Sequence, residues 1–141
     1  MKNFILKYIF RIDPSNPGQN LLKSFKDLFP GATNIEWSKE KDGIFEVIFR
    51  VDGIEKIAWF EKSGKWLKTE INYKLEMLDA DIRKKLEKYG QIMSSIYTKD
   101  SENKNAYEFI IRDSFQVRHV FLTDENGNVI DRRNFDESEL L

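Results

Sequence analysis

The chain has 141 residues, of which 40% are hydrophobic and 13% aromatic, a composition that fits one compact domain or two small halves sharing a core. Its 23 basic residues nearly balance its 24 acidic residues, giving a formal net charge of -1, so no field of one sign attracts nucleic acid or an anionic membrane. The lack of cysteine excludes disulfides and thiolate metal sites, and a single histidine, His119, excludes multi-histidine centres. We therefore expect no cofactor and no metal. No apolar run approaches the roughly 18 residues of a membrane-spanning helix.

Residues 1–14 form an N-terminal segment that begins MKNFILKYIFRID. Lys7 divides its apolar stretch, and Arg11 stands where a signal peptide would need a small-residue cleavage site. The pattern favours an ordinary amphipathic segment over a degenerate export signal. The residues that share one helical face are Phe4, Ile5, Tyr8, Ile9 and Ile12. Without a clear signal peptide the sequence suggests the cytoplasm, while the compartment itself stays open.

The first helix is predicted to start at the segment SNPGQ. Asn16 is a capping residue, Pro17 fits the first helical position, and Gln19 is placed to reach back as in a capping box. Apolar residues then recur at helical spacing until Pro30-Gly31 ends the helix. They are Leu21, Leu22, Phe25, Leu28 and Phe29. Four β-rich runs follow, at 33–39, 44–51, 54–60 and 65–73, separated by turn signals such as Asp52-Gly53.

The same order of elements is predicted for the second half. Asp79 or Asp81 caps a helix bearing Leu78, Ile82, Leu86 and Tyr89, and Gly90 ends it. Strands are then expected at 91–99, 105–112, 115–122 and 128–133. The predicted fold is α+β, with two tandem helix-plus-four-strand repeats forming one curved antiparallel sheet that has helices on one face. The repeats span 15–74 and 75–134, one compact domain over 15–134, and 135–141 form a C-terminal tail.

Hairpin register predicts which side chains the helices cover. A two-residue Asp52-Gly53 loop pairs Val51 with Ile54, Arg50 with Glu55, Ile48 with Ile57, and Glu46 with Trp59. A two-residue Ser63-Gly64 loop would place Phe60 opposite Leu67 and Trp59 opposite Lys68. A three-residue loop ending at Gly43 would put Ile35 and Trp37 on the covered side. The residues then expected on the uncovered face, as a partner-binding surface, are Glu46, Ile48, Arg50, Ile57, Trp59, Trp66, Lys68 and Glu70.

In the second half two registers are open. A strict two-residue Asp113-Ser114 loop would set Tyr107, Phe109 and Ile111 against Gln116, Arg118 and Val120. A three-residue loop would give them Phe115, Val117 and His119 instead. The second arrangement has the better apolar pattern, and we prefer it.

Several motifs of the first half resemble a known family. They are Phe29-Pro30-Gly31 at the helix end, Ile35-Glu36-Trp37, the Asp52-Gly53 hairpin, and Phe60 with Gly64-Lys65-Trp66-Leu67. Together they resemble the PepSY-like domains related in fold to the beta-lactamase inhibitory protein, well over residues 21–70 and more weakly over 78–133. The resemblance implies tandem helix-plus-four-strand units in one curved sheet. It also implies a non-enzymatic domain, usually exported by bacteria to the periplasm or beyond, with a protein-binding or inhibitory role. The shared motifs are turns, caps and core positions, so no functional residue carries over.

The leading hypothesis is therefore a non-enzymatic domain that binds an unidentified protein, or a second copy of itself, through the uncovered sheet face. The competing interpretation is that the N-terminal segment or the C-terminal tail covers this face, or that long charged side chains screen it. An alternative function is a carrier of a small apolar ligand or peptide in the curved sheet. His119 lacks a nucleophile or metal motif nearby, which favours a structural strand histidine over a general base. The segment DENGN at 124–128 is more typical of a hairpin turn than of a calcium loop.

Overall fold

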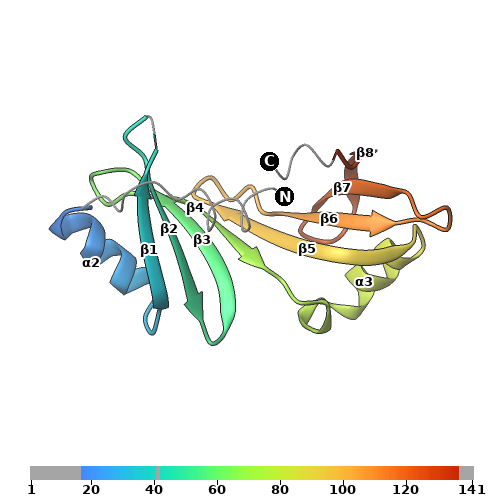
Figure 1. The fold of residues 1–141 in the computed structure, drawn as a ribbon, viewed down its shortest axis with the longest axis horizontal. Helices are drawn as coiled ribbons and strands as arrows, with labels where there is room; N and C mark the ends of the chain where they lie inside the picture. Colours follow the sequence, from blue (N-terminus) through green and yellow to red (C-terminus); the bar gives the residue numbers. More distant parts are fainter. Residues whose placement is uncertain (1–16, 41, 137–141) are drawn as a thin grey trace.

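The structure, a computed structural model, describes residues 17–40 and 42–136. The described residues form two α-helices, one short 3-10 helix and eight strands (Figure 1). In chain order these elements are α2 (Gln19–Leu28), β1 (Thr33–Lys39), β2 (Phe45–Val51), β3 (Ile54–Phe60), β4 (Trp66–Asn72), η1 (Leu75–Met77), α3 (Ala80–Glu87), β5 (Gln91–Asp100), β6 (Ala106–Arg112), β7 (Arg118–Asp124) and β8 (Val129–Asn134). Within these residues, neither helix has the length and apolar content needed to cross a membrane.

All eight strands belong to one antiparallel sheet, in which each strand pairs with the next one in sequence. The two halves are joined by β4 and β5, whose register runs from Lys68 opposite Asp100 to Asn72 opposite Ile96. The expectation of two tandem helix-plus-four-strand repeats is therefore wrong. The hydrogen-bonded ladder continues through the middle of the chain, so the architecture is a single eight-stranded sheet with two helices. The boundary of the compact domain at 15–134 stays a prediction, and residues 1–14 lie outside the described residues.

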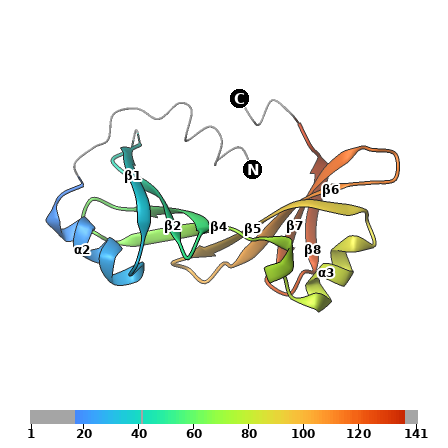
Figure 2. The ribbon, with the colours of Figure 1, turned by 60° about the horizontal axis from the view of Figure 1, so that its bottom comes forward.

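Both helices lie on the same face of the sheet, at its two ends (Figure 2). Under α2, Leu21 and Phe25 are buried in a cluster with apolar side chains of β1, β2 and β3. The ring of Phe25 meets Trp37 at 5.3 Å and Phe49 at 5.0 Å in edge-to-face contacts, which add to the stabilisation from burial. Trp37 is 9% exposed, which confirms its predicted place in the core.

The second helix also covers an apolar cluster. Asp79 caps α3, because its Oδ1 accepts a hydrogen bond from the backbone N–H of Asp81, as one of the two predicted alternatives required. Leu86 is fully buried, and it packs in a cluster with Phe109 and Ile111 of β6. The first helix starts differently from the prediction. It begins at Gln19 after Gly18, which has a φ of 79° and no side-chain cap, while Asn16 lies outside the described residues.

The register around Asp52-Gly53 is confirmed in full. Arg50 lies opposite Glu55, Ile48 opposite Ile57, and Glu46 opposite Trp59. At the other end of β2, the N–H of Glu40 bonds the carbonyl of Ile44, and Gly43 has the positive φ of 74° expected at this turn.

The register between β3 and β4 differs from the prediction at one point. Glu61 N–H bonds the carbonyl of Lys65, so the loop has three residues and ends at Gly64, with a φ of 100°. Trp59 still lies opposite Lys68, as predicted, but Phe60 lies opposite Trp66, and the register shifts between these pairs. Leu67 is the extra residue of the resulting β-bulge. The bulge exchanges the predicted positions of Trp66 and Leu67.

Two further predicted positions change for local reasons. Ile35 is 44% exposed rather than covered, because the β1–β2 register shifts between Thr33 and Glu36, where Asn34 has a φ of 53°. In the second half the preferred three-residue loop is confirmed, since Asp113 N–H bonds the carbonyl of Val117 and Ile111 lies opposite His119. Strand β7 nevertheless starts at Arg118 rather than at Phe115. Phe115 sits in the loop itself and is 84% exposed.

Candidate functional site

The predicted contact residues on the face opposite the helices differ widely in exposure. Ile48 and Ile57 are 3% and 0% exposed, Glu46 is 1% exposed and Glu70 is 8% exposed. None of these four belongs to the apolar clusters under the helices. Longer side chains flank the two isoleucines on their own face, because Glu36 and Glu70 occupy the cross-strand positions on either side. The exposed apolar patch expected around Ile48 and Ile57 is therefore corrected, since both side chains are buried.

Arg50 stays accessible beside this buried centre. Its Nη2 lies 2.6 Å from Glu55 Oε1, and its Nη1 donates to the carbonyl of Gly53 at 3.3 Å. The ion pair confirms the opposite charges that the sequence predicted across the hairpin. An ion pair this exposed contributes little to stability.

Trp66 lies on the helix-covered side and not on the predicted surface. It packs against the cluster under α2, and its Nε1–H donates a hydrogen bond of 2.8 Å to Thr69 Oγ1. The cause is the bulge at Leu67, which moves Trp66 to the side of Phe60. The two neighbouring tryptophans of the sequence therefore lie on opposite faces of the sheet.

Trp59 is half-buried on the face opposite the helices and is accompanied by Lys68. The Lys68 Nζ lies 4.4 Å from the centroid of the indole ring, which is the geometry of a cation–π contact. Each residue is held by regular strand pairing, so the contact is positioned by β3 and β4 rather than by a loop.

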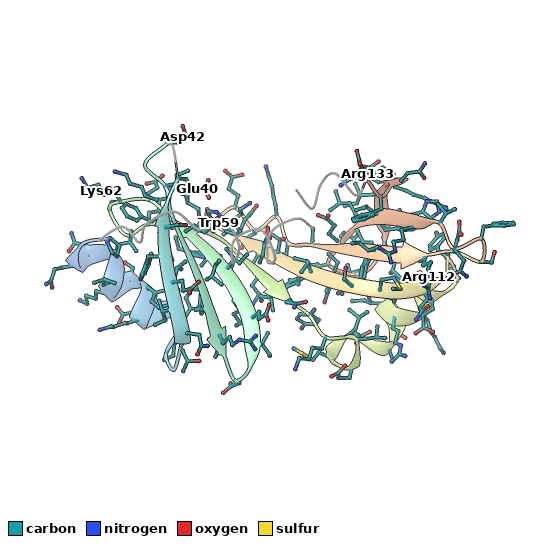
Figure 3. All side chains as sticks on the ribbon, viewed as in Figure 1. Glu40, Asp42, Trp59, Lys62, Arg112 and Arg133 are labelled. Carbon is teal, nitrogen blue, oxygen red and sulfur yellow. The ribbon has the colours of Figure 1, made fainter. Side chains whose placement is uncertain are left out.

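A groove of about 460 Å³ opens beside Trp59. Its residues come from three places: the β1–β2 hairpin, strands β3 and β4, and the loop between β5 and β6. They are Glu40, Asp42, Ile44, Trp59, Leu67, Lys68, Asp100, Ser101, Glu102 and Lys104. Figure 3 shows Trp59 below the hairpin that carries Glu40 and Asp42, and shows Arg112 and Arg133 far away in the second half. The groove joins an apolar floor to a charged rim.

The rim is built by pairing between distant parts of the chain. Lys68 pairs with Asp100 across β4 and β5, and the N–H of Ser101 bonds the carbonyl of Leu67 at 2.9 Å. Asp100 Oδ1 then accepts the N–H groups of Glu102 and Lys104, at 2.9 and 2.8 Å, which fixes the loop. The bulge that turns Trp66 away is thus also the point where the loop attaches.

Carboxylates outnumber ammonium groups in the groove, with Glu40, Asp42, Asp100 and Glu102 against Lys68 and Lys104. Both lysines interact within the site. Lys68 lies on Trp59, and Lys104 Nζ lies 3.1 Å from Glu102 Oε2. The hydrogen bond and charge of Glu102 raise the pKa of Lys104 above its ordinary value. The groove consequently has an acidic balance although the whole chain is nearly neutral.

The sequence did not identify the rim residues of this groove. Glu40, Asp42 and Glu102 stand in turns that are separated by some sixty residues, and only the β4–β5 pairing joins them. The Trp59–Lys68 pairing was the available signal, and the sequence predicted it correctly.

The other sequence candidates have structural roles. His119 Nε2 lies 2.9 Å from Asp113 Oδ2, and Asp113 Oδ1 accepts the N–H groups of Phe115 and Val117. The pair therefore fixes the β6–β7 hairpin. The segment at 124–128 is the predicted hairpin turn, because Asp124 Oδ1 accepts the N–H groups of Asn126 and Asn128. Among the residues that the structure describes, no cluster of three or more histidine or carboxylate side chains is placed to hold a metal ion.

The fold is similar to that of several solved structures. A DUF2874 family protein from Bacteroides ovatus has a TM-score of 0.71 and 18% identity, with 85% of this chain and 89% of that chain covered. A BLIP-like protein from Bacteroides fragilis has a TM-score of 0.69 and 19% identity, with 89% and 92% covered. A Bacteroides eggerthii protein provisionally described as periplasmic has a TM-score of 0.71 and 16% identity, with 85% and 90% covered.

These similarities establish a fold related to the beta-lactamase inhibitory protein, which confirms that part of the sequence resemblance. No protein-family model matches the sequence. No curated protein matches it either. The cytoplasmic expectation gains no support, since the one compartment named among these neighbours is the periplasm.

Proposed function

We infer that the chain is a non-enzymatic, PepSY-like binding domain that binds another protein through the sheet face opposite its helices. The observation that carries this proposal is the half-buried Trp59 beside an open groove, on a face where strands rather than loops hold the aromatic side chain. Tryptophan is enriched among the residues that dominate binding energies at protein interfaces. The fold neighbours support the proposal through one printed description, that of a BLIP-like protein.

The contact surface proposed here is narrower than the one the sequence predicted. Trp59, Lys68 and Arg50 are accessible and stay in it, whereas the buried Ile48 and Ile57 support the strands below. The groove residues on the hairpin and the β5–β6 loop extend the surface towards one end of the sheet.

A carrier of a small apolar ligand is the second candidate. The groove volume of about 460 Å³ falls within the range of small-molecule sites, which favours it. Its rim carries more charged than apolar side chains, however, and ligand pockets are predominantly apolar. A protein partner therefore fits the groove better.

Affinity capture with the full chain as bait tests this function. We expect one specific protein from the source organism to be recovered with the natural sequence and lost with Trp59→Thr. Phe115→Ser is the matched control, because Phe115 is an exposed aromatic residue in the β6–β7 loop, far along the chain from the groove. Equal recovery by the natural chain and Trp59→Thr, with loss in the Phe115 variant, would refute binding at this face.

A further inference from the structure

The groove beside Trp59 has the chemistry of a site for a cationic side chain. We propose that it takes a lysine or arginine from an extended basic segment of the partner protein, which stacks on the indole of Trp59 among the rim carboxylates. This inference rests on the proposed function and adds the chemical class of the partner.

The first support is that the indole already binds an ammonium group. Lys68 Nζ lies 4.4 Å from the ring centroid, so the face of Trp59 that borders the groove is compatible with a cation in shape and polarity. Indole is the aromatic side chain that attracts cations most strongly. A partner lysine or arginine would make the same contact from the open side.

The second support is the charge of the rim. Asp42 and Glu102 are exposed at opposite walls of the groove, one on the hairpin and one on the β5–β6 loop. Asp100 lies between them, fixed by its two backbone hydrogen bonds. Because the groove's own ammonium groups are fewer than its carboxylates, an incoming cation is attracted rather than repelled.

The third support is the apolar floor. Ile44 and Leu67 line the groove next to Trp59, and Leu67 is placed there by the bulge in β4. Lysine and arginine side chains have apolar stems that pack on such surfaces while the charged group stays at the polar rim. A floor of this kind distinguishes a basic side chain from a free inorganic cation.

A direct titration tests the inference with defined probes. The full chain is titrated with a short synthetic peptide of lysine and leucine residues, and with a matched peptide in which glutamate replaces each lysine. We expect only the lysine peptide to bind, with an affinity that falls as salt is added. Trp59→Phe, which keeps the ring volume but weakens the cation–π contact, should lower the affinity by about threefold, and Trp59→Thr by about tenfold.

Charge variants separate the groove from general electrostatics. Asp42→Asn combined with Glu102→Gln should weaken binding of the lysine peptide by about threefold or more. The control is Glu76→Gln combined with Asp131→Asn, which removes the same charge from exposed residues that do not line the groove. Lys68→Met should strengthen binding by about twofold, since it frees the ring face and removes a competing cation. Circular dichroism of each variant verifies that the fold is kept.

Three results would overturn the inference. They are equal binding of both peptides, no binding of the lysine peptide, and equal losses in the groove and control variants. None of them decides the protein-binding role. A partner captured through Trp59 whose affinity is unchanged by the rim variants would uphold the proposed function and refute only a basic partner segment.

Discussion

Lys68 lies over the indole of Trp59, with its Nζ 4.4 Å from the ring centroid, and the two residues are direct cross-strand neighbours on β3 and β4. This contact holds the accessible tryptophan in one orientation on the face opposite the helices. It joins the regular part of the sheet to the groove formed by the hairpin and the β5–β6 loop.

Replacing Lys68 by methionine should therefore change the surface more than the stability. We expect the free energy of unfolding to fall by about 0.5–1 kcal/mol, the value of a cation–π contact at an accessible site. Lys62→Met is the matched control, because Lys62 is exposed in the turn that follows β3 (Figure 3). Urea denaturation measures both variants. A loss above about 2 kcal/mol for Lys68→Met would show that this side chain belongs to the core.

The two tryptophans should respond differently to truncation. Trp66→Ala is expected to cost about 3 kcal/mol, because the side chain packs on the cluster under α2 and donates a hydrogen bond to the buried Thr69. Trp59→Ala should cost clearly less. Guanidinium denaturation of the two variants compares them directly. An equal or reversed order would place the bulge at Leu67 elsewhere.

Tyr107 should make the protein sensitive to alkaline pH. Burial, followed by the charges of Tyr73 and Tyr97, raises its pKa from 10.0 to about 12. A group whose pKa is raised on folding stabilises fully below its unfolded pKa and loses that effect as the pH rises towards the folded value. Stability should hence fall between pH 10 and about 12. Tyr107→Phe should reduce this decline in denaturant titrations across the range, and an unchanged slope would contradict the assignment.

Asp113 should contribute to the acid sensitivity of the β6–β7 hairpin. The hydrogen bond from His119, and then the backbone N–H of Val117, hold the pKa of Asp113 below its ordinary value of 3.8. A carboxylate with a depressed pKa stabilises above the unfolded value, and this stabilisation disappears as the pH falls through the folded value. Below pH 3.8 the amides of the hairpin should therefore exchange hydrogen faster.

Asp113→Asn tests the same group at neutral pH. This variant should show fast exchange in the β6–β7 hairpin already at pH 7, with no further acceleration on acidification. Asp131→Asn is the control, since Asp131 is an exposed strand residue of β8. Exchange in the hairpin that is as slow in Asp113→Asn as in the natural chain would show that the turn residues hold it without the carboxylate.

The sequence by itself determined most of the local structure. Turn residues fixed the ends of the strands, since glycines and aspartates supply the positive φ and the side-chain acceptors that hairpins need. The cross-strand order around Asp52-Gly53, the cap at Asp79 and the core position of Trp37 all follow from alternation and spacing, which depend on neighbouring residues only.

Only the tertiary structure decided which surface is exposed and which residues meet. One extra loop residue before Gly64 shifts the register, and because side chains alternate along a strand, the resulting bulge sends Trp66 to the covered face. The pairing of β4 with β5 likewise joins Asp100 to Lys68 and merges the two expected repeats into one sheet. Such contacts depend on strands that are distant in sequence, so local patterns carry little information about them. The groove beside Trp59 is the product of both events.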